Sequence, residues 1–289
     1  MKSIQPSVAF LVVALLAAGF AGVPRFDTAL AAQKMKPEEL VAKHLEAFGS
    51  AEARAKVTAR AAGGSSNFIV NIGGAAHLSG SAMFVSAGPR FRFGMRFPVP
   101  DYTGEDLGFD GQRAASALLP TGGRSALSQF VEQQDALLKE GLLGGALSTA
   151  WPLLRLEQAQ PKLEYRGLKK IEGQQWHELG YRPRKANAEL KVLLYFDAAT
   201  FRHVRTRYSF EIGASIGTRE ASNINQEGYR SLTEDFDDFH VVDGLSLPHK
   251  YHLQYSAEGR GPTTLRDWQI VIERVQHNLK LEDDLFIIK

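Results

Sequence analysis

The sequence contains no cysteine among its 289 residues. This absence excludes thiolate nucleophiles, disulfide bonds, zinc sites with cysteine ligands and iron–sulfur clusters. It also leaves no cysteine for a lipid anchor, so the chain is not itself a bacterial lipoprotein. The excess of positive charge is small, since 34 basic and 32 acidic residues give a formal charge of +2. That balance differs from the strongly basic surface of a nucleic-acid-binding protein, and no nucleic acid is expected as a partner.

Long hydrophobic runs are scarce as well. The apolar run 8–20 has thirteen residues, which is short for a membrane-spanning helix of about 20 residues. Lys2 precedes this run, and small residues at positions 28–32 follow it. This pattern is typical of a secretory signal peptide; an uncleaved membrane anchor is the alternative. We therefore expect a signal peptide over 1–32, a single domain over 33–289 and a periplasmic location.

Alternating hydrophobicity dominates the remaining sequence. In the segment 90–97, Phe91, Phe93, Met95 and Phe97 alternate with arginines, which predicts a strand with one apolar and one polar face. Such alternation favours antiparallel pairing. Further strands are expected at 162–168, 174–181, 189–196, 203–212, 229–240, 247–256 and 265–276.

Helical periodicity appears at two places. Residues 37–48 predict an N-terminal helix that begins at a proline and is followed by Gly49. Residues 124–147 predict an amphipathic helix, and 151–156 a second short helical piece. We therefore expect an α+β fold, in which a single strongly curved antiparallel sheet forms an incomplete β-barrel and helices cover its concave face.

Four motifs, taken together, resemble the outer-membrane lipoprotein-sorting superfamily of periplasmic lipoprotein carriers. They are an N-terminal helix ending at 45–49, an Asp-x-x-Thr hairpin within 195–204, an Asp-Gly-x-x-x-Pro hairpin within 236–250, and a last strand with an Asp-Asp-x-Phe tail at 270–286. The resemblance implies a half-barrel whose helices cover bound acyl chains. It also implies a non-enzymatic carrier without a cofactor, and no gating residue is transferred from the family.

A carrier of this kind needs an apolar lining, a movable cover and an interior without charges. The alternation and the helix pattern give the candidate ligand-lining residues Phe68, Val70, Ile72, Met83, Val85, Phe91, Phe93, Met95, Phe97, Leu127, Phe130, Val131, Tyr208 and Phe210. The alternative for each of them is a packed core without a cavity. The expected partners are lipoprotein acyl chains or phospholipid and an inner-membrane exporter, and the protein is expected to act as a monomer.

Other functions are open on the same sequence. An envelope-stress sensor or partner-binding module could use the same fold. Residues 213–217 match the Gly-x-Ser-x-Gly pattern around Ser215, with Asp235 and His252 among the residues that could complete a serine hydrolase. No helix pattern follows Ser215, which disfavours that enzyme. His249 and His252 lie three residues apart, so on a strand they face opposite sides and predict no metal site.

A second alternative concerns the arginines opposite the apolar faces. Arg90, Arg92, Arg96, Arg202, Arg205 and Arg207 could form a basic stripe for lipid headgroups or an acidic partner. A solvated strand face is the simpler interpretation, because the overall charge is nearly balanced.

Overall fold

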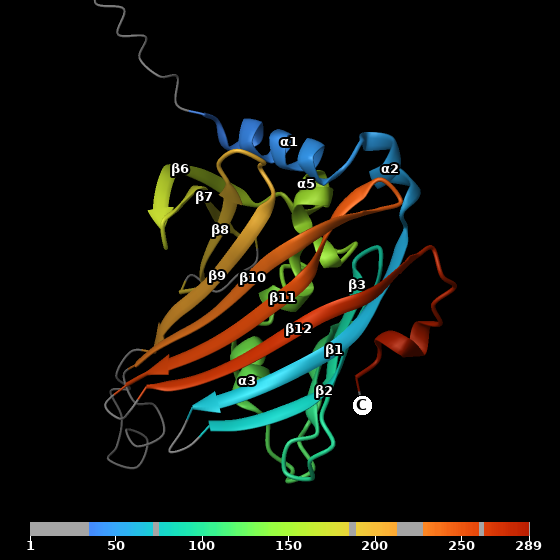
Figure 1. Cartoon of the computed structure of the whole chain (residues 1–289), viewed down its shortest axis with the longest axis vertical. Coiled ribbons are helices and arrows are strands. Elements are labelled where there is room, and N and C mark those ends of the chain that lie inside the picture. Colours follow the sequence, from blue (N-terminus) through green and yellow to red (C-terminus); the bar gives the residue numbers. More distant parts are fainter. Residues whose placement is uncertain (1–34, 72–74, 185–188, 213–227, 260–262, 289) are drawn as a thin grey trace, which may run out of the picture. The chain divides into compact units, whose positions relative to one another are not determined.

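The computed structural model describes residues 35–71, 75–184, 189–212, 228–259 and 263–288. Residues Met35–Lys289 form one compact unit, and Figure 1 shows the arrangement of its elements. The predicted signal peptide, Ile72 and the motif around Ser215 lie outside the described residues.

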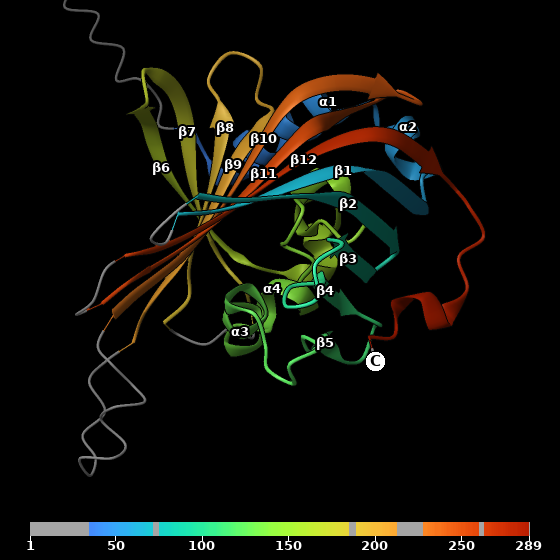
Figure 2. The ribbon, with the colours of Figure 1, turned by 60° about the horizontal axis from the view of Figure 1, so that its bottom comes forward.

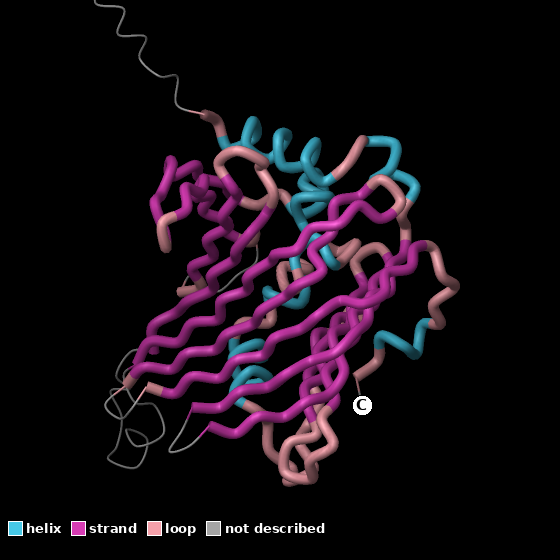
Figure 3. The backbone as a smooth tube through the Cα atoms, in the orientation of Figure 1, coloured by secondary structure: helices cyan, strands magenta, loops and turns pink. Residues whose placement is uncertain are grey.

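One antiparallel sheet of twelve strands contains all the described strands, in the order β5-β4-β3-β2-β1-β12-β11-β10-β9-β8-β7-β6. Figure 3 shows the strands in magenta and the helices in cyan. The bounds are β1 Ala59–Asn71, β2 Ala75–Ala87, β3 Arg90–Arg96, β4 Gly104–Phe109, β5 Ala114–Ser116, β6 Lys162–Ile171, β7 Gln174–Arg182, β8 Lys191–Asp197, β9 His203–Ile212, β10 Gly228–Val242, β11 Leu245–Glu258 and β12 Thr264–His277. All seven strands expected beyond residue 160 form, each within a few residues of its predicted bounds.

The first and last long strands of the unit meet in the middle of the sheet. β1 pairs with β2 on one side and with β12 on the other. The side chain of Asn278, just after β12, fastens this seam: its Oδ1 accepts a hydrogen bond from Thr58 N at 2.9 Å, and its Nδ2 donates to Lys56 O at 2.9 Å. Two other motifs behind the family resemblance are turns. In the Asp-x-x-Thr hairpin, Asp197 Oδ1 accepts a hydrogen bond from Thr200 N at 2.7 Å. In the Asp-Gly hairpin, Asp243 and Gly244 form a turn with positive φ.

Two helices precede the sheet. α1, Pro37–Phe48, has the predicted bounds and buries Leu40, Val41, His44 and Phe48. α2, Ala51–Lys56, begins after Ser50, whose side chain accepts a hydrogen bond from Ala53 N. α1 contacts β6 and β11.

The segment between β5 and β6, residues 124–159, is called the cover below. It contains α3 Ala126–Gln133, α4 Ala136–Lys139, the 3₁₀ turns η1 Gly145–Leu147 and η2 Pro152–Arg155, and α5 Leu156–Ala159. The cover lies against one face of the sheet, which we call the inner face (Figure 2).

The prediction of one continuous amphipathic helix over 124–147 was wrong. The apolar side chains do face the sheet, but the helix ends at Gln133 and again at Lys139. Gly141, Gly144 and Gly145 have φ values of 68°, 80° and 49°, a left-handed conformation that ends a right-handed helix. The cover is therefore a chain of short helical turns: α3 ends before Gln134, whose φ of −126° and ψ of 55° are not helical, and glycines separate α4 from η1.

The structure confirms a single antiparallel sheet accompanied by a few short helices. The sheet is open, because β5 and β6 are its two edges, and it does not curl strongly. Of the predicted incomplete barrel, the structure therefore supports the single antiparallel sheet but not its strong curvature. Among the described helices, none has both the length and the apolar character needed to cross a membrane.

Candidate functional site

Most predicted lining residues meet in one apolar layer between the inner face of the sheet and the cover. Their side chains are at most 5% exposed: Phe68, Phe91, Phe93, Met95, Phe97, Leu127, Phe130, Val131, Tyr208 and Phe210. Val70 is half-buried and packs against the same layer. The alternation in the sequence thus correctly separated the buried face of β3 from its arginine face.

Aromatic contacts fill this layer in the structure. The ring of Phe84 stacks on Phe93 with 4.3 Å between centroids, and Phe130 lies 5.2 Å from Phe210 and 5.9 Å from Tyr255. These distances are those of a packed core. The described part of the layer therefore shows a closed interior, and the lining role of its residues is a matter for the proposal below.

Two of the predicted lining residues face the other way. Met83 and Val85 flank Phe84, which is 2% exposed and turned to the inner face. Because strand residues alternate, Met83 and Val85 point to the outer face, where Met83 pairs with Gly94 and Val85 with Arg92. The prediction for these two was wrong because apolar residues occur on both faces of β2.

A buried carboxylate, Glu234, joins the sheet to the cover. Its Oε1 accepts hydrogen bonds from Gly144 N and from the Tyr251 hydroxyl, each at 2.6 Å, and its Oε2 lies 2.6 Å from the Tyr208 hydroxyl. That hydroxyl also lies 3.0 Å from Leu142 O. Glu234 is fully buried, and burial raises its pKa to about 7. The carboxyl thus holds the glycine turn of the cover onto β9, β10 and β11.

A second buried carboxylate, Glu105 on β4, holds the start of α3. Its Oε2 accepts from the Ser125 hydroxyl at 2.6 Å and from the Ser128 hydroxyl at 3.1 Å, and its Oε1 accepts from the Tyr102 hydroxyl at 2.7 Å. Ser125 also caps α3 by accepting from Ser128 N at 2.9 Å. Burial raises the pKa of Glu105.

A buried guanidinium, Arg60 on β1, is the third polar contact to the cover. Its Nη1 donates to Ala146 O in η1, and its Nε donates to His277 Nε2 at 3.0 Å. Burial lowers the pKa of Arg60 to about 10. Nearby, Thr149 N in the cover donates to the Ser86 hydroxyl of β2 at 2.9 Å.

The expectation of an interior without charged residues was therefore wrong. Glu105, Glu234 and Arg60 are each at most 2% exposed, and hydrogen bonds to hydroxyl, amide and carbonyl groups compensate for their burial. The sequence held a usable signal for Glu234, because it occupies the inward position between Leu232 and Phe236 in the alternation of β10. Arg60 and Glu105 have no comparable signal, since their segments alternate weakly.

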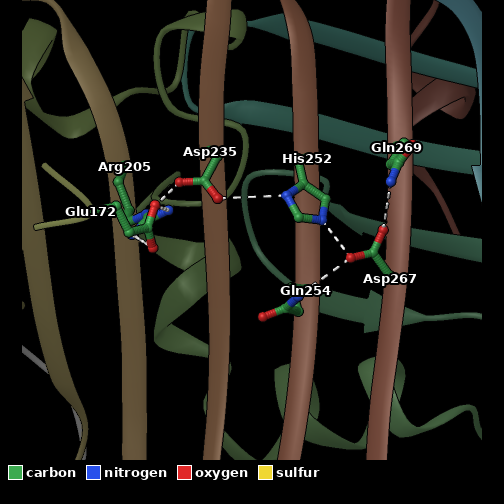
Figure 4. A network of polar contacts seen from close by, with 7 residues as sticks. All are labelled: Glu172, Arg205, Asp235, His252, Gln254, Asp267 and Gln269. Atoms are coloured by element: carbon green, nitrogen blue, oxygen red, sulfur yellow. Dashed lines mark hydrogen bonds and ion pairs between the residues drawn. The ribbon is translucent and has the colours of Figure 1, made fainter. Parts of the chain in front are cut away.

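The outer face of the sheet carries a chain of alternating charges across β9 to β12 (Figure 4). Arg205 bonds to Glu172 at 3.1 Å and to Asp235. His252 Nδ1 lies 3.5 Å from Asp235 Oδ2, and His252 Nε2 lies 2.5 Å from Asp267 Oδ2. Hydrogen bonds to the two aspartates raise the pKa of His252 to about 9, so the imidazole is charged at neutral pH.

We expect His252→Gln to lower the free energy of unfolding at pH 7 by about 1 kcal/mol, because the network is partly exposed and screened by solvent. The imidazolium's contribution is complete below its unfolded pKa of about 6.5 and is lost as the pH rises through about 9. Urea unfolding of the wild type and of His252→Gln at pH 6, 7.5 and 10 measures this contribution. The difference between the two proteins should shrink toward pH 10; an equal difference at all three values would contradict an ionic role.

The arginines opposite the apolar faces are largely paired. Arg92 and Arg96 each lie 2.7 Å from Asp106 Oδ2, and Arg90 bonds to Asp283 next to the tail turn η4, Asp283–Phe286. Arg92, Arg96 and Arg205 thus form ion pairs between strands, and Arg90 forms one with the tail. The arrangement favours the solvated strand face over a free basic stripe.

The residues proposed for a hydrolase have other contacts. Asp235 and His252 are members of the outer network, and His249 Nδ1 lies 2.9 Å from Ile272 O. His249 and His252 thus have separate partners, as their spacing on a strand predicted. Ser215 lies outside the described residues.

No protein-family model matches the sequence, and neither does any curated protein. Among solved structures, the chain is similar to one described as an outer membrane lipoprotein-sorting protein domain from Vibrio parahaemolyticus, with 14% identity and a TM-score of 0.48, covering 87% of this chain and 97% of the other. A DUF1329 family protein from Desulfovibrio piger has 14% identity and a TM-score of 0.47, covering 88% and 98%. A LolA superfamily protein from Nitrosomonas europaea has 10% identity and a TM-score of 0.44, covering 88% and 98%.

Proposed function

We propose that this chain is a non-enzymatic carrier or binding protein for the acyl chains of lipoproteins or lipids. The acyl chain lies between the inner face of the sheet and the cover. The observation that supports this proposal is the apolar layer, which lies between the inner face of the sheet and the helical cover. Within the described residues, the cover adds no strand to the sheet and is fastened to it through a few polar contacts.

The energetics of exchange support a cover that is displaced by its cargo. A sixteen-carbon chain costs about 12 kcal/mol to expose to water, at about 0.8 kcal/mol for each CH₂. A fully buried leucine or phenylalanine costs about 1.5–3 kcal/mol. About four to eight cover side chains of this kind, Leu127, Phe130 and Leu137 among them, therefore balance one acyl chain. The closed and loaded forms are then close enough in free energy for reversible uptake.

The local structure of the cover suits such a movement. Its helices are short, and Gly141 and Gly144 lie between α4 and η1. The contacts from Arg60, Glu105 and Glu234 fix the closed position together with the apolar layer, and displacing the cover breaks no strand pairing. In this proposal the open sheet curves around the loaded chain as an incomplete barrel. The signal peptide over 1–32 directs the domain 33–289 to the periplasm, where it acts as a monomer and receives cargo from an inner-membrane exporter.

A disulfide across the cover tests the proposal. The pair Ser86→Cys and Thr149→Cys joins β2 to the cover at a place where the two residues already share a hydrogen bond, and the chain has no other cysteine. We expect the oxidised variant to lose acyl binding and the reduced variant to retain it, because only the reduced cover can move. Native mass spectrometry after detergent-free purification measures the bound lipid.

The two single-cysteine variants are the controls, since they change the same positions without linking them. Equal lipid loading of the oxidised and reduced double variant would show that the cover does not move. A wild-type protein that carries no acyl material and gains none from added lipid would overturn the carrier function itself.

A further inference from the structure

An open pocket of about 720 Å³ lies at the edge of the cover, and we call it the outer pocket. Its volume falls within the range of small-molecule sites, about 300–1,000 Å³. One wall belongs to the cover, with α4, η2 and α5, and the other to the turn between β2 and β3 and to the end of β4. Phe109, Ala136, Ala150 and Pro152 form its apolar part. Phe109, Ala136 and Ala150 also belong to the hydrophobic cluster of the packed layer, so the pocket borders that layer.

The lining of the outer pocket has a net charge of +1, because Lys139, Arg155 and Arg184 outnumber Asp135 and Glu140. Asp135 bonds to Lys139, and Glu140 accepts a hydrogen bond from the Tyr181 hydroxyl at 3.3 Å. Arg184 Nη1 donates to the uncharged amide of Gln160 at 2.6 Å. Arg155 forms no ion pair or hydrogen bond with the residues that the structure describes.

The position of the pocket connects it to the proposed acyl site. Ala150 forms part of the pocket lining and is itself 2% exposed, and Trp151, the next residue, is fully buried in the apolar layer. A group bound in the pocket therefore lies next to the place where the cover packs on the apolar layer. An amphiphile can place its polar end in the pocket and its apolar end under the displaced cover.

We infer that the outer pocket binds the carboxylate or phosphate group of an anionic lipid, with Arg155 and Arg184 as the recognising side chains. The forked donors of arginine match the oxygens of both groups. The inference rests on the proposed acyl-binding function and narrows its cargo. An uncharged anchor, such as the thioether-linked diacylglycerol of a lipoprotein, gains nothing from the arginines, so the pocket selects anionic lipids over such anchors.

The matched probes cis-parinaric acid and methyl cis-parinarate test this inference, because they share one fluorescent acyl chain and differ in the carboxylate. We expect the acid to bind the wild-type protein at least tenfold more tightly than the ester. In the double variant Arg155→Gln, Arg184→Gln, the affinity for the acid should fall to that for the ester, and the affinity for the ester should stay unchanged. The control Lys169→Gln, Lys280→Gln removes the same charge from exposed positions outside the pocket and should preserve the preference.

The outcomes separate the two proposals. Failure of both probes to bind overturns the acyl-binding function and, with it, this inference. Equal binding of acid and ester, or an unchanged preference in the arginine variant, overturns the inference and leaves the acyl site standing. Competition then assigns the source of the anion: oleate or phosphatidylglycerol vesicles should displace the acid. Displacement of the acid by millimolar inorganic phosphate as effectively as by lipid would show a free-anion site and contradict lipid recognition.

Discussion

Replacing Phe93 with aspartate is expected to lower the free energy of unfolding by more than about 4 kcal/mol. The side chain of Phe93 is fully buried, stacks on Phe84 at 4.3 Å and meets Tyr251 edge-on at 6.0 Å. The substitution loses this packing and places a carboxylate where no partner is available among the contacting rings. Urea unfolding followed by circular dichroism measures the loss.

Phe93→Leu is the matched variant, since it keeps an apolar side chain and is expected to cost about 1–2 kcal/mol. A Phe93→Asp protein that unfolds within about 1 kcal/mol of the wild type would contradict the packed position of the ring. A further readout concerns function: if Phe93→Asp folds and takes up acyl chains as the wild type does, Phe93 has no part in the lining.

Replacing Glu234 with glutamine is expected to remove a large part of the pH dependence of stability. Burial raises the pKa of Glu234 to about 7 from an ordinary value of 4.5, so the folded protein favours the protonated form. The stability of the wild type is then greatest below about pH 4.5 and falls as the pH rises to about 7. The fall is on the order of 3 kcal/mol for this carboxyl. Glutamine has no proton to lose, so the variant should lack this contribution.

Urea unfolding between pH 4.5 and 8 compares the two proteins. Glu52→Gln is the control, because Glu52 is exposed on α2 with a side-chain exposure of 78%, and it should preserve the slope. If Glu234→Gln keeps the wild-type slope over this range, the carboxyl of Glu234 is charged throughout it. The hydrogen bonds to Gly144, Tyr208 and Tyr251 then hold a permanent anion.

The strands were predictable because many of them alternate buried and more exposed side chains over part of their length. The alternation of Phe91, Phe93, Met95 and Phe97 with arginines identified β3 and its buried side, and the same period located the strands from β6 to β12. α1 was predictable because its proline start and its apolar face lie within twelve local residues. These signals depend on neighbours in sequence, so no knowledge of the fold was needed.

The features that the sequence left hidden depend on residues far apart. Glu105 meets Ser125 and Ser128, and Glu234 meets Gly144, only because the sheet and the cover come together. The division of the cover into short turns follows from the backbone conformations of Gln134, Gly141 and Gly144, which an amphipathic pattern does not encode. Met83 and Val85 were misplaced because an apolar side chain on an outer strand face looks the same in sequence as one on an inner face.

The place of β1 in the sheet has a consequence for how the chain acquires its structure. β1 needs both β2, which follows it directly, and β12, the last strand of the unit. A ribosome makes β1 some two hundred residues before β12, so one long edge of β1 stays unpaired during most of synthesis. Long-range pairing of this kind is slow, and an unsatisfied strand edge invites aggregation. The nascent polypeptide therefore exposes a strand edge that is open to aggregation until β12 has been made.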